Sequence, residues 1–112
     1  MSLALGQIGF FQLSNLARNK VPYALFLIEV DPPSEVQGDL ALVMKSAIPT
    51  SAELLLEKIA SLQLKTDHPI VLMCEQGGSS LSCSKELINR GFVNVYCVKG
   101  GWKNVLVEAG LR

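Results

Sequence analysis

Residues 69–80, PIVLMCEQGGSS, decide the fold of this chain. Ile70 to Met73 is an unbroken apolar run of strand length, and Cys74 follows it directly. Two glycines and two serines then lead into a stretch with helical spacing that continues to Arg90. Strands buried on both faces have this continuous apolar pattern, and both faces are covered when helices pack on each side of a parallel sheet. The segment therefore predicts a buried strand, a tight loop and a helix.

Further strands and helices are predicted around this segment. Ala24–Ile28 is a second continuous apolar run, and Val93–Val98 is a third predicted strand. The secondary structure of residues 34–49 is harder to predict, and Leu40–Met44 fits either a short strand or a helical turn. The remaining helices are expected near residues 13–18, 50–62 and 102–109. Strands that alternate with helices in this way predict an α/β domain with an open, mostly parallel sheet.

The helix expected near residues 50–62 has a local start signal. Thr50 and Glu53 have the spacing of a capping box, in which a hydroxyl precedes a carboxylate by three residues. One apolar stripe is predicted on this helix at Leu54, Leu55, Ile59 and Leu62.

Composition limits the classes of partner. The chain has 112 residues, 49% of them apolar, so one domain over residues 1–112 is expected. Ten basic residues balance ten acidic ones, and this leaves no net field that would attract nucleic acid or an anionic membrane. The aromatic residues are expected in the core rather than on a base-stacking surface: Phe10, Phe11, Phe26, Phe92 and Trp102. Three cysteines without paired spacing indicate a reducing, cytoplasmic location.

The loop after Cys74 has the composition of an anion-binding site. Gly77 and Gly78 allow several backbone N–H groups to point at one spot, and the following helix adds the positive end of its dipole. Such a field favours the thiolate form of a cysteine that faces it, so Cys74 is the predicted catalytic nucleophile. The residues expected to bind substrate are Glu75, Gln76, Gly77, Gly78, Ser79 and Ser80. The alternative is that Cys74 is a small buried residue that only ends a strand.

Other reactive side chains have weaker functional interpretations. Cys83 is expected to pack a helix against the sheet, and Cys97 to lie in the core. His68 is the only histidine, and a strand separates it from Cys74 by about 20 Å, so it is not predicted to act as the base. The cysteine spacing does not match a zinc site, and neither a metal nor another cofactor is predicted.

From Cys74 onward the chain resembles the rhodanese-like sulfurtransferase family. The active loop of that family is Cys-x-x-Gly-x-Arg-Ser, and Cys74, Gly77 and Ser80 match it here. Further matches follow at the family's spacing, at Leu87, Gly91-Phe92, Asn94-Val95 and Gly100-Gly101-Trp102. The resemblance implies an open five-stranded parallel sheet with helices on both faces. It also implies a persulfide on Cys74, loaded by a small sulfur donor and discharged onto a thiol or protein acceptor.

Three departures from the family pattern concern charge. Ser79 stands where the family commonly has an arginine, and Asp31 replaces the usual arginine of the front motif. Glu75 places a negative charge beside the nucleophile, which disfavours an anionic donor such as thiosulfate.

A cysteine phosphatase is also disfavoured. The loop of such an enzyme ends in an arginine that clamps phosphate, and neither Ser79 nor Ser80 can do this.

Two functions from different classes follow from the sequence. The first is a sulfurtransferase or sulfur carrier that moves sulfane sulfur through Cys74. The second is a catalytically weak or inactive module of the same fold that binds a protein partner or a small anion. Persulfide formation distinguishes them, because only the first needs the thiol.

Overall fold

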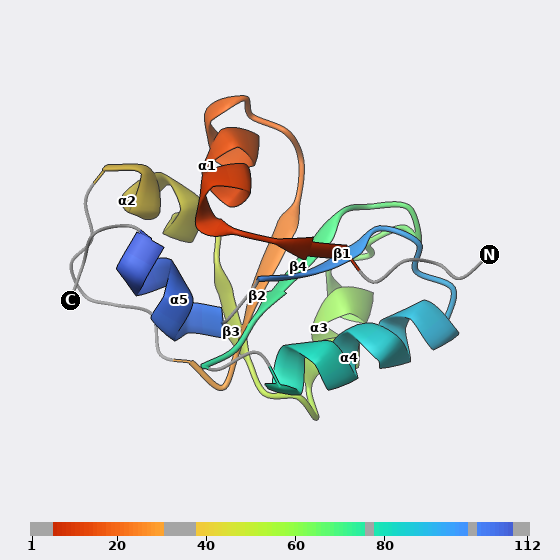
Figure 1. Ribbon diagram of the computed structural model, residues 1–112. Coiled ribbons are helices and arrows are strands. Elements are labelled where there is room, and N and C mark those ends of the chain that lie inside the picture. The colour runs from red at the N-terminus through yellow and green to blue at the C-terminus, as the bar shows by residue number, and fades with distance from the viewer. Residues whose placement is uncertain (1–5, 31–37, 76–77, 99–100, 109–112) are drawn as a thin grey trace.

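A computed structural model of the chain describes residues 6–30, 38–75, 78–98 and 101–108. These residues form five strands and five helices that alternate along the chain (Figure 1). The strands are β1 (Gly6–Ile8), β2 (Ala24–Ile28), β3 (Ile48–Thr50), β4 (Ile70–Met73) and β5 (Val95–Val98). The helices are α1 (Phe10–Arg18), α2 (Gly38–Met44), α3 (Leu55–Ser61), α4 (Gly78–Asn89) and α5 (Gly101–Glu108).

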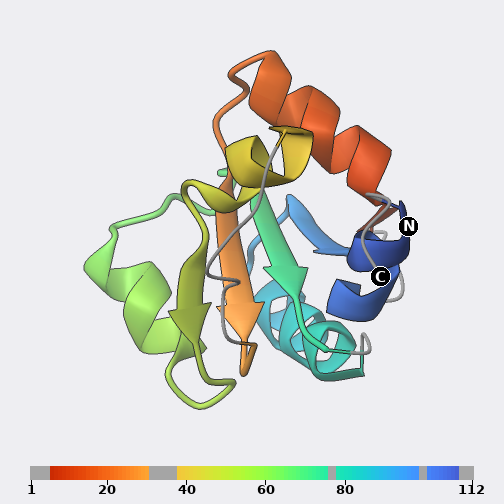
Figure 2. The ribbon, with the colours of Figure 1, turned by 90° about the vertical axis from the view of Figure 1, so that its left-hand side faces the viewer.

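The strands form one parallel sheet in the order β1-β5-β4-β2-β3. The central strand β4 lies between β2 and β5, with Met73 opposite Leu27 and Leu72 opposite Cys97. In Figure 2 the arrowheads of β2, β3 and β4 point the same way. The carboxyl ends of all strands therefore lie together along one side of the sheet, which we call its carboxyl edge. Ligands bind there in open α/β folds. The predicted five-stranded open parallel sheet is confirmed.

Helices cover both faces of the sheet. One core contains Leu25 and Leu27 together with side chains from α1, α2 and α5. The opposite core contains Phe26 and Ile28 together with side chains from α3 and α4. Successive residues of a strand point to opposite faces, so the unbroken apolar runs of β2 and β4 supply both cores, as predicted.

The predicted capping box at residues 50–53 is wrong. Thr50 belongs to β3 and pairs with Ile28, and its hydroxyl donates to the Ser51 carbonyl rather than capping a helix. The Ser51 hydroxyl accepts the Leu54 N–H at 3.2 Å, within a turn that precedes α3. Leu54 and Leu62 are 48% and 46% exposed, so only the middle of the predicted stripe is buried. Sheet pairing of the preceding segment takes precedence over the local helix-start signal.

Two further features, β3 and Phe11, differ from the sequence-based expectation. Leu40–Met44 belongs to helix α2, which is one of its two predicted forms, whereas β3 follows it as a strand that was not predicted. β3 has three residues and is the outermost strand, next to β2. It contains Pro49, and proline is tolerated in an outermost strand because its missing N–H is not needed for pairing. Phe11 was expected in the core but is 66% exposed, because Phe10 is the residue of this pair that faces the sheet.

Candidate active site

Cys74 lies immediately beyond β4, at the shared carboxyl edge of the strands. It is 4% exposed and belongs to the core on the α3 and α4 side of the sheet. The backbone N–H of Ser80, in the first turn of α4, donates to the Cys74 sulfur at 3.4 Å. A helix N-terminus therefore directs a donor at this sulfur, an arrangement that favours negative charge on it.

Helix α5 holds the same loop from the other side. The Trp102 N–H donates to the Cys74 carbonyl at 2.7 Å, and the Lys103 N–H donates to the Glu75 carbonyl at 3.3 Å. These bonds direct the Cys74 carbonyl toward α5. Since the peptide is trans, the N–H of Glu75 points to the opposite side of the chain. Two helix N-termini thus set the orientation of the loop backbone.

Gly101 makes the docking of α5 possible. Its φ is +72°, a left-handed conformation that favours glycine, and a Cβ there would lie 2.5 Å from the Cys74 carbonyl oxygen. Sequence reasoning did not assign this residue a role in the site. The signal was the Gly100-Gly101-Trp102 match to the family pattern, whose physical reason is the close approach of α5 to the loop.

The two loop serines differ in environment. Ser79 is exposed, whereas Ser80 is fully buried. Within the described residues, the Ser80 hydroxyl has no hydrogen-bond partner. The Ser84 hydroxyl one turn later donates to the Ser80 carbonyl at 2.5 Å and lies 2.6 Å from the Cys97 sulfur. Buried hydroxyls are normally paired, so within the described part of the chain Ser80 retains an unused hydroxyl donor, on the residue whose N–H is bonded to the Cys74 sulfur.

The remaining thiols are arranged as structural residues. Burial raises the pKa of the Cys83 thiol, and the nearby Cys74 and Glu29 add to this rise. Burial also raises the pKa of Cys97, although its hydrogen bond with Ser84 opposes part of the effect. Both residues therefore stay protonated at neutral pH. Cys97 is in the core and Cys83 packs half-buried against it, as the sequence predicted.

Two carboxylates, those of Glu29 and Glu75, lie at this edge of the sheet together with Lys103 of α5. Glu75 is exposed directly after Cys74. Glu29 follows β2 with φ +56°, and its carboxylate accepts the Ala52 N–H at 3.5 Å. A left-handed conformation is unfavourable for a residue with a side chain. Here it is accommodated because the Glu29 N–H donates to the Thr50 carbonyl at 2.8 Å.

Several predicted positions contribute little or lie outside the described residues. Gln76 and Gly77 of the loop are outside them, as are Asp31 and Gly100. His68 lies just before β4, at the sheet edge opposite Cys74. In the described ranges, no group of three or more His, Cys, Asp or Glu side chains could hold a metal. None of the helices described is long and apolar enough to cross a bilayer.

The rhodanese-like domain model matches residues 12–108 of this chain. The chain belongs to the rhodanese-like domain family. A Vibrio cholerae protein named thiosulfate sulfurtransferase GlpE is 42% identical over 52 residues, which cover 42% of this chain and 49% of that protein. A relative of the same name from Stutzerimonas stutzeri is 43% identical over 37 residues, 33% of this chain and 34% of that protein. The chain thus spans about half the length, or less, of these two relatives.

Solved structures of other proteins share this fold. The human single-domain sulfurtransferase TSTD1 superposes with a TM-score of 0.69 at 14% identity, covering 94% of this chain and 98% of that one. A thiosulfate sulfurtransferase from Pseudomonas aeruginosa superposes with a TM-score of 0.74 at 18% identity, covering 95% of this chain and 19% of that one. At these identities the similarity concerns the fold alone.

Proposed function

We propose that residues 1–112 form one rhodanese-like domain that acts as a sulfurtransferase or sulfur carrier, with Cys74 as its nucleophile. The observation that carries the proposal is the bond from the Ser80 N–H to the buried Cys74 sulfur. A donor already aimed at this sulfur stabilises a thiolate without reorganisation when the reaction begins. No other titratable side chain has to act as a base, which fits the position of His68 at the opposite edge.

The proposed reaction has two displacement steps. The Cys74 thiolate attacks the outer sulfur of a donor persulfide, the sulfur–sulfur bond of the donor breaks, and the donor leaves as a thiolate. Cys74 then carries the transferred sulfur as a persulfide. An acceptor thiolate attacks that outer sulfur, and the Cys74 thiolate is the leaving group. Each step moves one sulfane sulfur atom from one thiolate to another with no net oxidation or reduction, so the scheme requires no redox cofactor.

The loop has separate roles in this scheme. The Ser80 N–H binds the negatively charged sulfur, and the bonds from α5 hold the backbone of Cys74 and Glu75 in place. The substrate contacts the loop residues 75–80. The buried Ser80 hydroxyl supplies a further donor to the outer sulfur of the persulfide. The exposed Ser79 hydroxyl contacts the donor as it enters, in the position where the family commonly has an arginine.

Charge favours a weakly charged sulfur donor over thiosulfate. Glu75 is an exposed carboxylate next to Cys74, and Ser79 cannot offset it as an arginine would. Repulsion between like charges is strongest for the thiosulfate dianion and weaker for a persulfide. We therefore expect a persulfide or polysulfide to be the better donor, with a small thiol or a protein thiol as acceptor and with no role for nucleic acid or membrane.

Intact mass spectrometry tests this function directly. The protein is incubated with thiosulfate or with a low-molecular-weight persulfide, and each sample is measured before and after dithiothreitol. The expected result is a reversible gain of one sulfur atom that Cys74→Ala abolishes. The Cys83→Ala and Cys97→Ala variants are the matched controls, and both should load normally. If no donor loads folded wild-type protein, the sulfurtransferase proposal fails and the binding-module alternative takes its place.

A further inference from the structure

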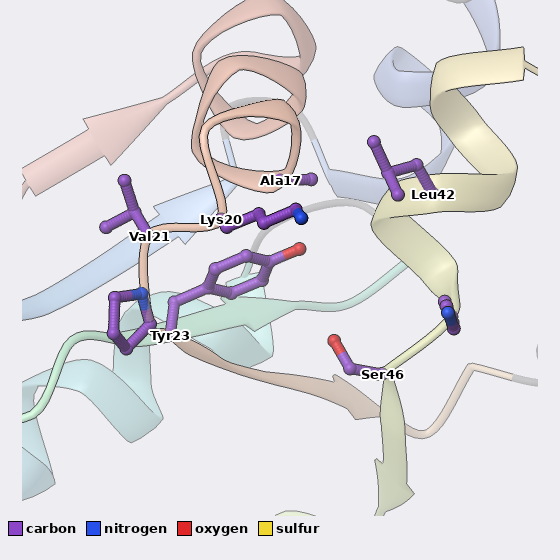
Figure 3. Close-up of a pocket in the computed structure, with 8 residues that line it drawn as sticks. Ala17, Lys20, Val21, Tyr23, Leu42 and Ser46 are labelled. Carbon is purple, nitrogen blue, oxygen red and sulfur yellow. The ribbon is translucent and has the colours of Figure 1, made fainter.

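A separate cavity lies at the edge of the sheet where the strands begin. It has a volume of about 380 Å³ and is bounded by the end of α1, the start of β2 and the end of α2. Its lining residues are Ala17, Lys20, Val21, Pro22, Tyr23, Leu42, Lys45 and Ser46. We call it the Tyr23 cavity (Figure 3). It is at the opposite edge of the sheet from Cys74, because Tyr23 precedes β2 whereas Cys74 follows β4 in a parallel sheet.

Four polar side chains that can donate hydrogen bonds line this cavity. Two are the ammonium groups of Lys20 and Lys45, and two are the hydroxyls of Tyr23 and Ser46. In Figure 3 the Lys20 amine and both hydroxyls point into the same space between α1 and α2. None of the eight lining residues is acidic. The lining thus carries two positive charges and no carboxylate to neutralise them.

The polar groups are held in place by the fold. The Tyr23 ring packs against the core on the α1 and α2 side, so its hydroxyl is fixed at the cavity. Burial raises the pKa of Tyr23, partly opposed by the hydrogen bond from Ser46, so the phenol remains a neutral donor at physiological pH.

Lys20 is held by the backbone at the end of α1. Its N–H donates to the Ala17 carbonyl, and the Val21 N–H donates to the Leu16 carbonyl. These bonds close the end of the helix with Lys20 at φ +56°, a position that glycine commonly occupies. The position of the Lys20 backbone is thus set before any ligand arrives.

We propose that the Tyr23 cavity binds a small organic anion, with a carboxylate or phosphate group between the two lysines and an apolar body against the remaining walls. Those walls are Ala17, Val21, Pro22 and Leu42, and Leu42 is 40% exposed. The two ammonium groups and the Tyr23 hydroxyl match the acceptor oxygens of such a group, while the Ser46 hydroxyl donates to Tyr23. The site is independent of the proposed chemistry at Cys74, since the two lie at opposite edges of the sheet.

The test is an amide-resolved NMR titration of the whole chain at constant ionic strength. The probes are benzoate and phenyl phosphate, with inorganic phosphate as the comparator that lacks an apolar body. We expect saturable shifts at the Val21, Tyr23 and Ser46 amides, with tighter binding of both organic probes than of inorganic phosphate. Shifts at the Cys74 loop report the other site and are scored separately, so a failure of one proposal leaves the other intact.

The decisive variant is Lys20→Gln with Lys45→Gln, which removes both charges and keeps an unbranched polar side chain at each position. Glutamine is compatible with the backbone at position 20, because Gln63 adopts φ +56° in the same hydrogen-bonded ending of α3. The matched control is Lys58→Gln with Lys65→Gln, which removes two exposed lysines that do not line the cavity. We expect the first pair to weaken binding roughly fivefold or more and the control pair to leave it unchanged. Non-saturable shifts in the wild type, or equal weakening in both variants, would overturn the proposal.

Discussion

The two edges of the sheet offer donors to ligands in different ways. At the carboxyl edge, the donors that hold the Cys74 loop are backbone N–H groups, and the charged residues there include Glu29, Glu75 and Lys103. At the opposite edge, the Tyr23 cavity presents side-chain ammonium and hydroxyl groups without a carboxylate in its lining. A site made of backbone donors depends on how closely segments approach one another. A site made of side chains depends on which residues the fold brings together.

The largest effect is expected from Gly101→Ala, which tests the dependence on close approach. The added Cβ would lie 2.5 Å from the Cys74 carbonyl oxygen, and φ +72° is unfavourable for alanine. We expect a loss of about 3 kcal/mol in the free energy of unfolding, together with at least tenfold slower sulfur loading. Denaturant unfolding and mass-spectrometric loading measure the two effects.

Gly91→Ala is the matched control for Gly101. Gly91 also has a left-handed φ, +100°, but a Cβ there would meet nothing within 4 Å. This variant should lose only about 1 kcal/mol and load sulfur at the wild-type rate. Equal losses in the two variants would show that conformational strain alone, without the approach of α5, explains the role of Gly101.

The next largest effect on stability is expected at the two buried serines near the carboxyl edge, where replacement by alanine should have different consequences. Ser84→Ala removes a hydroxyl that bonds to the Ser80 carbonyl and lies beside Cys97, so the protein should lose about 1 to 2 kcal/mol of stability. Ser80→Ala removes a buried hydroxyl that has no partner in the described part of the chain, so stability should stay constant or rise slightly.

The rate of sulfur loading should respond in the opposite way, with Ser80→Ala affected more than Ser84→Ala. If the Ser80 hydroxyl donates to the outer sulfur, Ser80→Ala loads sulfur roughly tenfold more slowly while Ser84→Ala loads near the wild-type rate. Single-turnover loading with a persulfide, measured on both variants at a temperature where each is folded, distinguishes the two. Normal loading by Ser80→Ala would remove its hydroxyl from the proposed site.

The sequence predicted the parts of the molecule that local pattern determines. The apolar runs gave β2 and β4, and the glycine loop placed Cys74 at the end of a strand. β3 was missed because it is short, lies at the edge and is defined by pairing with β2 rather than by its own composition. The role of Gly101 and the presence of Lys20 and Lys45 in the lining of one cavity were also missed. Each depends on contacts between segments that are distant in the chain.

A smaller effect is expected from the charge at the carboxyl edge. Glu75→Gln removes the exposed carboxylate beside Cys74. It should raise the rate of loading from thiosulfate roughly threefold relative to loading from a persulfide, since repulsion acts mainly on the dianion. The gain should shrink in high salt because salt screens exposed charges. Glu57→Gln on α3 is the control, and an identical change in that variant would argue against a local effect of Glu75.

The smallest effect is expected on the free energy of unfolding at alkaline pH, through the titration of Cys83, Cys97 and Tyr23. Burial raises the pKa of Cys97 above 9.0 and that of Tyr23 above 10.0, whereas the unfolded chain titrates at the ordinary values. The unfolded state therefore loses these protons first as the pH rises, and stability, which is full below pH 9.0, declines above it. Cys97→Ala and Cys83→Ala should each flatten part of the decline that starts near pH 9, and Tyr23→Phe the part that starts near pH 10. Urea unfolding across this range measures these effects, and a decline unchanged in any of these variants would place the responsible group elsewhere.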